Sequence, residues 1–275
     1  MKTLSRLLLL TLALVVRPNR DSGADALFSP SAELLERGIQ VREHRIQGVE
    51  VIEVVLGKAA FDARLPALVY FHGRGGDVHL PRGAHQKIEQ PYRLFLPRGP
   101  LSLGNGRAWA TPSVRHPRRA QLEKEILEAA DRMIDVIDEL RRTRSIAGEP
   151  ILAGFSQGGM LALAIAARSP DRVSTVIPIA SQLVVSLDPE RLERHALDGR
   201  ALPEIHALHG EADRIVYYDE AKESLEALRS LGFVVTHQGF AEVGHEVSSE
   251  MSKEYSKLLR AALKRALERA IGIGV

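Results

Sequence analysis

The sequence predicts an α/β protein with a mostly parallel sheet, helices on both faces of that sheet and an antiparallel hairpin near the N-terminus. Three short apolar runs, 66–73, 92–99 and 149–156, do not alternate with polar residues, as expected of strands covered on both faces. From 121 to 142, between the second and third runs, apolar residues recur at helical spacing among charges. Strand, helix and strand in this order favour a parallel sheet.

The remaining elements follow in chain order. Two β-rich runs, 39–46 and 49–57, are joined by Gln47 and Gly48, which predicts the hairpin. Three later runs are strand candidates with helices between them: 172–181, 202–210 and 233–240. A charged helix is expected from about 246 to 269. Because no repeat, low-complexity segment or long linker divides the chain, residues 27–275 are expected to form one domain.

Composition bounds the class of protein. The 275 residues are 45% hydrophobic, enough for one large core. Thirty-seven basic and 35 acidic side chains leave a net charge of +2 and are scattered along the chain, so nucleic acid is not an expected partner. The absence of cysteine excludes disulfides, thiolate metal sites and a thiol nucleophile.

Residues 1–26 are predicted to be a signal peptide or an apolar N-terminal anchor. Lys2 and Arg6 precede the apolar run 7–16, which is the layout of a signal peptide and about half of what a spanning helix needs. A small-x-small site, Ala24–Ala26, lies rather far downstream. Export or membrane tethering is therefore expected, with a cytoplasmic protein as the alternative. Membrane association is expected only through this segment.

Four loops are candidates for chemistry. In an open parallel sheet, ligands bind where the carboxyl ends of the strands meet. The loops predicted at this edge read HGRGGD, GFSQGG, HGEADRIV and VGHEVS and begin at residues 72, 154, 209 and 243.

The second loop carries a candidate nucleophile. Gly154–Gly158 reads G-F-S-Q-G after a buried strand and before a helix, which is the pattern of a nucleophile elbow with Ser156 at its tip. The tight turn requires flanking residues with almost no side chain. The alternative is a serine that only caps the helix in a glycine-rich turn.

A serine hydroxyl needs a base to remove its proton, and the base needs an acid to hold its tautomer. The order expected after a nucleophile elbow is serine, acid, histidine. Asp213 follows the strand 202–210 and His245 follows the strand 233–240, so both are predicted at the edge that holds Ser156. Less favoured candidates lie inside strands, in a charged surface helix or at helix starts: His206, His237, His195, Asp198 and Asp219.

The first loop is expected to stabilise negative charge. A tetrahedral intermediate carries an oxyanion, which backbone N–H donors stabilise. The N–H groups of Arg74 and Gln157 are the predicted donors, and the alternative is a flexible turn whose glycines only relieve crowding. His72 is expected to orient this loop by hydrogen bonding rather than to transfer protons.

Taken together, the motifs YFHGRGGD, GNGRAW, ILAGFSQGGMLAL, HALHGEADRIV and VGHEV resemble the carboxylesterase, phospholipase and acyl-protein thioesterase branch of the α/β-hydrolase fold. The resemblance runs from about Pro66 to the final helix. It implies a serine hydrolase without metal or organic cofactor that acts on carboxylic esters or thioesters through Ser156, Asp213 and His245. Arg74 stands where such proteins commonly carry an apolar residue, which puts a lipid-like acyl preference in doubt.

Substrate contacts are less sharply indicated. Gly73, His72 and Trp109 are the candidate substrate-binding residues for a small-molecule or lipid-like ester, with simple packing as the alternative for Trp109. Two other functions stay open: a non-catalytic module that binds acyl ligands on the same scaffold, and a peptidase of the same fold.

Overall fold

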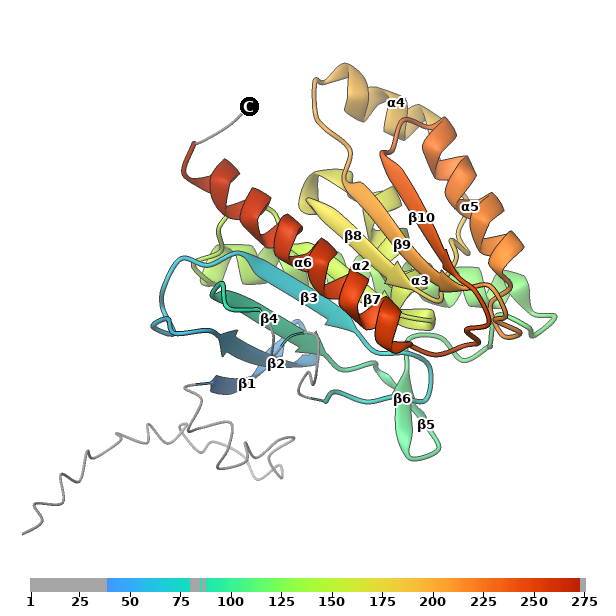
Figure 1. Ribbon diagram of the computed structural model, residues 1–275, viewed down its shortest axis with the longest axis horizontal. Helices are drawn as coiled ribbons and strands as arrows, with labels where there is room; N and C mark the ends of the chain where they lie inside the picture. The colour runs from blue at the N-terminus through green and yellow to red at the C-terminus, as the bar shows by residue number, and fades with distance from the viewer. Residues whose placement is uncertain (1–38, 80–84, 86–87, 273–275) are drawn as a thin grey trace, which may run out of the picture.

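The computed structural model describes residues 39–79, 85 and 88–272. In this part of the chain an eight-stranded sheet has the order β1-β2-β4-β3-β7-β8-β9-β10 (Figure 1). Its strands are β1 (Gln40–Ile46), β2 (Val49–Leu56), β3 (Ala67–Phe71), β4 (Tyr92–Pro97), β7 (Ile151–Phe155), β8 (Thr175–Ile179), β9 (Glu204–Gly210) and β10 (Val235–Phe240). The predicted signal or anchor segment, 1–26, lies outside the described residues.

The antiparallel part of the sheet is its N-terminal side. β1 pairs with β2 through a two-residue turn, in which Gln47 has φ 49° and Gly48 has φ 77°. Positive φ at both turn residues matches the right-handed twist of hairpin strands. β2 also pairs antiparallel with β4, and every later pair in the sheet is parallel. The predicted mostly parallel sheet with an N-terminal hairpin is confirmed.

Helices cover both faces, as predicted. They are α2 (Arg119–Thr143), α3 (Gln157–Arg168), α4 (Pro189–Leu197), α5 (Tyr218–Ser230) and α6 (Ser249–Ala270), with a short 3₁₀ turn at Pro170–Arg172. Successive strand residues point to opposite faces. Val69 belongs to the core beneath α2 and α3, whereas Leu68 belongs to the core beneath α6, which crosses the front of the sheet in Figure 1. Burial on both sides explains why these strands show no alternation in the sequence.

Three details differ from the expectations. The last helix begins at Ser249 rather than near 246, because the Ser248 side chain caps it by accepting from the Met251 N–H at 3.1 Å. A hairpin of β5 (Leu101–Leu103) and β6 (Gly106–Ala108), which was not predicted, projects from the sheet (Figure 1). His195, expected on a solvated surface, is buried.

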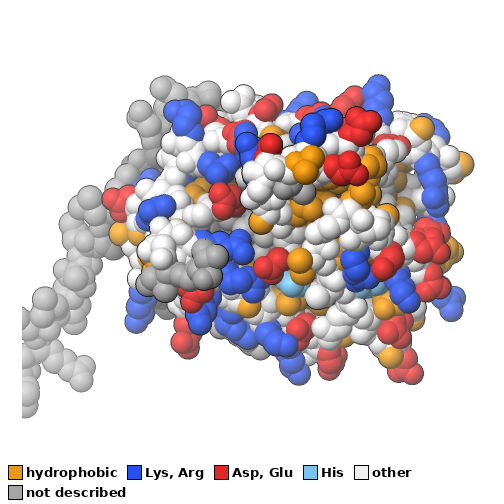
Figure 2. All heavy atoms as spheres, turned by 90° about the horizontal axis from the view of Figure 1, so that it is seen from above, with side chains coloured by type: hydrophobic (Ala, Val, Ile, Leu, Met, Phe, Trp, Pro, Cys, Tyr) orange, Lys and Arg blue, Asp and Glu red, His pale blue; other side chains and the backbone are white. Residues whose placement is uncertain are grey.

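Surface and membrane features can be stated for the described ranges. No helix within them is long and apolar enough to cross a bilayer. On the face shown in Figure 2, Lys and Arg side chains are interspersed with Asp and Glu side chains. The described residues hold no group of three or more histidine or acidic side chains that could bind a metal ion.

Candidate active site

Ser156 lies at the sharp turn between β7 and α3. Its backbone has φ 53° and ψ −119°, a strained conformation for a residue with a side chain. The flanking glycines permit the turn: a Cβ on Gly154 would lie 2.4 Å from the carbonyl carbon of Gly158, and one on Gly158 would lie 2.2 Å from the carbonyl oxygen of Phe71. The backbone around Ser156 is therefore as crowded as the glycines of the G-x-S-x-G pattern predict.

Two contacts from β8 and the loop after it hold the strained turn. The Ser156 N–H donates to the carbonyl of Ile179 at 2.8 Å, and the Ser181 hydroxyl donates to the carbonyl of Ser156 at 2.9 Å. Because β8 and the loop after it bind both backbone groups of Ser156, the position of its side chain is fixed by buried structure on the neighbouring strand.

The structure brings Ser156, His245 and Asp213 together. His245 Nε2 lies 2.9 Å from Ser156 Oγ, and His245 Nδ1 lies 2.7 Å from Asp213 Oδ2. A carboxylate only accepts, so Nδ1 carries the proton and the Nε2 lone pair faces the serine hydroxyl. This tautomer is the one in which an imidazole can remove the proton of the serine.

Asp213 is held by its own turn. Its side chain has no exposed surface, and Oδ1 accepts from the backbone N–H groups of Ile215 and Val216 at 2.8 and 3.0 Å. No Lys or Arg forms an ion pair with Asp213 within the described ranges. The carboxylate is thus stabilised by dipoles, and its charge is directed at His245.

The less favoured candidates lie elsewhere in hydrogen-bond networks of their own or on helices. His206 contacts Thr236 and Glu204. Asp219 lies in the first turn of α5, and Asp198 follows α4.

The two predicted oxyanion donors come from different segments, Arg74 from the loop after β3 and Gln157 from the start of α3. Gln157 is the first residue of α3, where backbone N–H groups have no acceptor inside the helix. Across the described part of the chain, no protein acceptor takes the N–H of Arg74 or of Gln157. The exposed guanidinium of Arg74 donates instead to the carbonyl of Thr111, at 2.9 and 3.1 Å. Both N–H groups are free to bind a ligand.

The β5–β6 hairpin fixes the loop that carries Arg74. The Gly75 N–H donates to the carbonyl of Arg107 at 2.8 Å, and the Arg107 N–H donates to the carbonyl of Gly76 at 2.6 Å. A Cβ on Gly106 would lie 2.0 Å from the carbonyl oxygen of Gly75. A signal for this hairpin exists in the sequence, since Gly104 and Asn105 form a two-residue connection of a type common in hairpins.

His72 and Trp109 lie behind the same loop. His72 Nδ1 donates to the carbonyl of Gly73 at 2.8 Å, and Nε2 accepts from the Gly99 N–H at 3.0 Å. Burial lowers the pKa of His72, which keeps this imidazole neutral. Trp109 is 2% exposed and its indole N–H donates to the carbonyl of His72 at 2.9 Å. These contacts favour packing for Trp109, and substrate binding by Gly73, His72 and Trp109 stays a prediction.

The side chain of Gln157 completes the support. Its Oε1 accepts from the backbone N–H groups of Trp109 and Ala110 at 2.8 and 3.2 Å, and its Nε2 donates to the carbonyl of Ala110 at 2.9 Å. The residue after the serine therefore has a buried side chain that fixes the 109–110 segment. The sequence indicated only a role for its backbone N–H, which stays a prediction.

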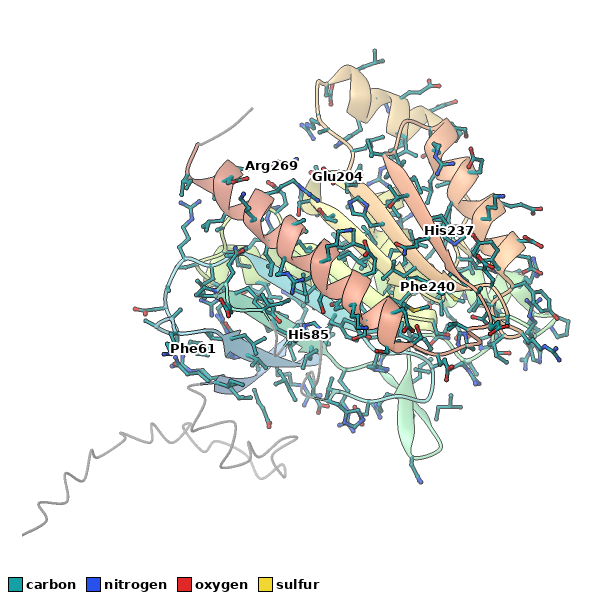
Figure 3. All side chains as sticks on the ribbon, viewed as in Figure 1. Phe61, His85, Glu204, His237, Phe240 and Arg269 are labelled. Carbon is teal, nitrogen blue, oxygen red and sulfur yellow. The ribbon has the colours of Figure 1, made fainter. Side chains whose placement is uncertain are left out.

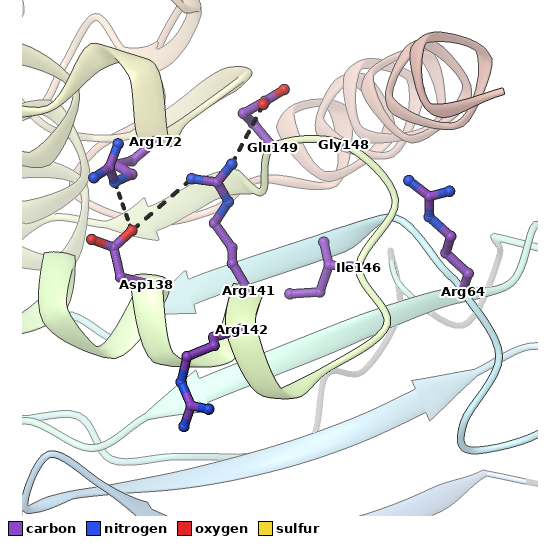
Figure 4. Close-up of a pocket in the computed structure, with 8 residues that line it drawn as sticks. All are labelled: Arg64, Asp138, Arg141, Arg142, Ile146, Gly148, Glu149 and Arg172. Atoms are coloured by element: carbon purple, nitrogen blue, oxygen red, sulfur yellow. Dashed lines mark ion pairs between the residues drawn. The ribbon is translucent and has the colours of Figure 1, made fainter. Parts of the chain in front are cut away.

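A polar pocket of about 630 Å³ lies away from this site (Figure 4). It is found near the amino ends of β3 and β7, and its lining includes Arg64, Arg141 and Glu149. Arg141 lies 3.6 Å from Glu149, and Arg172 lies 2.6 Å from Asp138, so much of the charge is paired internally. The pocket contains none of the residues described above.

The fold and the site together define an α/β-hydrolase, in which a serine at an elbow, a histidine and an acid meet at the carboxyl ends of parallel strands. Comparison with known proteins narrows the class. The sequence profile of the phospholipase/carboxylesterase family matches residues 54–263. The chain belongs to this family.

Individual relatives agree with that placement. A lysophospholipase-like protein 1 from Mus musculus is 32% identical over 171 residues, which are 59% of this chain and 67% of that protein. An acyl-protein thioesterase 1 from Gibberella zeae is 30% identical over 95 residues, 34% of this chain and 40% of that protein. The crystal structure of esterase PE8 superposes with a TM-score of 0.62 at 22% identity, covering 76% of this chain and 97% of that chain.

These findings confirm the predicted fold, the predicted family and the predicted enzyme class, a carboxylic ester hydrolase. The alternative of a non-catalytic binding module is not favoured.

Proposed function

We propose that this protein hydrolyses carboxylic esters or thioesters through an acyl-enzyme formed on Ser156. The observation that carries the proposal is the hydrogen-bond chain from Ser156 Oγ through His245 to Asp213, with distances of 2.9 and 2.7 Å. Each of the three residues has one role in this proposal: Ser156 is the nucleophile, His245 the general base and acid, and Asp213 the group that orients the imidazole.

The reaction has two halves. As Ser156 Oγ attacks the carbonyl carbon, its proton moves to His245 Nε2, and the carbonyl oxygen becomes an anion. When the bond to the alcohol or thiol breaks, His245 gives its proton to the departing oxygen or sulfur. Water, deprotonated by the same imidazole, then attacks the acyl-enzyme and releases the acid.

The backbone N–H groups of Arg74 and Gln157 are proposed to bind the oxyanion. Support comes from their lack of a protein acceptor and from the contacts that hold the loop of Arg74 and the start of α3 in place. A donor that is already oriented stabilises the developing charge without reorganising, and removal of one such donor costs about 2.7 to 4 kcal/mol in other hydrolases.

The substrate is proposed to be an acyl ester or thioester, in keeping with the lysophospholipase-like and acyl-protein thioesterase relatives. Arg74, whose backbone N–H is a proposed oxyanion donor, also carries an exposed guanidinium. We propose that this cation favours a polar or anionic group on the substrate over a long apolar chain.

The test is hydrolysis of p-nitrophenyl esters from acetyl to palmitoyl, and of an acyl thioester, by the parent and by Ser156→Ala. The parent should hydrolyse one or more of them, and Ser156→Ala should lose the catalysed rate. A serine-directed phosphonate should label the parent and leave Ser156→Ala unlabelled. A folded parent that neither hydrolyses any substrate nor takes up the phosphonate would refute the proposal.

The compartment is a separate question. Export or tethering through residues 1–26 stays a prediction, with a cytoplasmic protein as its alternative. Mass spectrometry of the mature N-terminus in fractionated cells checks it, because cleavage near Ala26 is expected only after export.

A further inference from the structure

His209 is a buried histidine beside the carboxylate of Asp213 that the proposed mechanism does not use. It is the penultimate residue of β9 and is 1% exposed. Its Nε2 lies 2.9 Å from the carbonyl oxygen of Val216 and 3.3 Å from Asp213 Oδ2. Both neighbours can only accept, so Nε2 carries the proton.

The other ring nitrogen identifies the charge state of His209. Its Nδ1 is buried and has no hydrogen-bond partner among the described residues, so a proton there would be unsatisfied. Two rings pack edge-on against it, Tyr218 on α5 at 5.8 Å and His237 on β10 at 5.9 Å between centroids; Figure 3 shows His237 on its strand. Burial lowers the pKa of His209, and it lowers that of His237 to about 4. His209 is a neutral donor.

Donor groups therefore lie around both oxygens of Asp213, and the N–H of His209, which is hydrogen-bonded to the carbonyl of Val216, is the most distant of them at 3.3 Å. Oδ1 accepts from two backbone N–H groups, and Oδ2 faces the imidazoles of His245 and His209. Val216 is held from both sides, since its N–H binds Asp213 and its carbonyl binds His209. His209 thus joins the rigid strand β9 to the turn that carries the carboxylate.

We propose that His209 is a positioning residue that aims Asp213 Oδ2 at His245 and takes part of the carboxylate's charge. This inference rests on the proposed function, because it assigns a role within the same site. By sharing Oδ2, His209 weakens the hold of Asp213 on a protonated His245.

Three variants and a matched control test the inference in the full chain. His209→Phe keeps a ring but removes the donor. His209→Gln offers an N–H at about the reach of Nε2, and His209→Asn reaches only the position of Nδ1. His237→Phe is the control, because His237 belongs to the same ring cluster and forms no contact with Asp213.

In His209→Phe we expect kcat to fall about tenfold with little change in KM. His209→Asn should behave in the same way, which keeps the test valid if the Phe variant does not fold. His209→Gln should retain kcat within about threefold, and His237→Phe should retain the parent kcat and KM.

A spectroscopic signal separates this inference from the proposed function. The proton between His245 Nδ1 and Asp213 should give a downfield NMR resonance, and loss of the second donor should move it further downfield whether or not any ester is hydrolysed. If the parent is inactive yet this shift occurs, the proposed function fails and the inference stands. If the parent is active and the Phe and Asn variants keep its kcat and its resonance, His209 is only a core residue and the inference is wrong.

Discussion

Two buried carboxylates in this molecule each contact a histidine, yet their surroundings differ. The side chains of Glu53 on β2 and Asp213 after β9 both have 0% exposed surface. Glu53 lies 2.6 Å from His44 Nε2, and Asp213 lies 2.7 Å from His245 Nδ1. Glu53 also receives hydrogen bonds from Arg93 and Arg144. Asp213 receives its further hydrogen bonds from backbone N–H groups, and the neutral imidazole of His209 lies 3.3 Å from it.

The partners decide what each carboxylate can do. Burial alone would raise the pKa of Glu53, but hydrogen bonds from His44, Arg144 and Arg93 outweigh burial and hold it at about 2. Two permanent cations neutralise Glu53. The interactions of its carboxylate stabilise the contacts between β1, β2, β4 and the segment after α2. Among the described residues no such cation pairs with Asp213, and its charge is available to a proton that arrives on His245. Glu53, whose charge is neutralised by arginines, therefore stabilises the fold, whereas the charge of Asp213 can stabilise a protonated His245 during the proposed reaction.

The largest expected effect is a loss of activity on removing the charge of Asp213. Asp213→Asn removes the charge but keeps the shape, so kcat for ester hydrolysis should fall by about 10⁴, because the wrong imidazole tautomer is favoured and the imidazolium loses its counter-charge. Steady-state kinetics on p-nitrophenyl esters measures it. The urea midpoint should change little, and a variant that keeps more than a tenth of the parent kcat would remove Asp213 from the proposed mechanism.

Removal of the charge from Glu53 should have the opposite signature. Glu53→Gln leaves Arg93 and Arg144 without their counter-charge, so the free energy of unfolding should fall by about 3 to 5 kcal/mol. Urea denaturation followed by circular dichroism measures the loss. The folded fraction should keep the parent kcat.

The matched control for Glu53→Gln is Glu50→Gln. Glu50 pairs with Arg98 at 3.1 Å but is 34% exposed, so its substitution should cost less than about 1 kcal/mol. Equal losses at the two positions would contradict the importance of burial.

Acid should reveal the contribution of Glu53 to stability. The pKa of Glu53 is about 2 in the folded chain against 4.5 for the free side chain, so its stabilisation is complete above about pH 4.5 and is lost as pH falls towards 2. The loss should amount to about 3 kcal/mol in the parent. Urea midpoints between pH 6 and 2.5 measure it. Glu53→Gln should lack this part of the pH dependence, and parallel curves for parent and variant would contradict the assignment.

The smallest effect is expected at His44, and His245 serves as the comparison. His44→Gln removes one of three partners of Glu53, and the arginines remain, so unfolding free energy should fall by only about 1 kcal/mol and kcat should not change. His245→Gln leaves Ser156 without a base and should abolish turnover. Comparing both variants in the same kinetic and urea assays tests whether a histidine beside a carboxylate matters for its geometry or for the charge it can accept.

Much of this protein was determined locally by its sequence. The apolar strands, the helix periodicity and the glycines around Ser156 act within a few residues, so the mostly parallel sheet and the elbow could be predicted. The order of Ser156, Asp213 and His245 along the chain then limited the candidates at the carboxyl edge.

Only the tertiary structure decided the supporting contacts. Glu53 accepts a hydrogen bond from Arg144, 91 residues away along the chain. Gly75 is hydrogen-bonded to Arg107, on a hairpin whose short strands give only a weak signal in the sequence. His209 stands near the end of the predicted strand 202–210, and its place beside Asp213 depends on how the following turn folds back. Such contacts join residues whose distance is set by strand order and packing rather than by local propensity, which is why no pattern along the chain contains them.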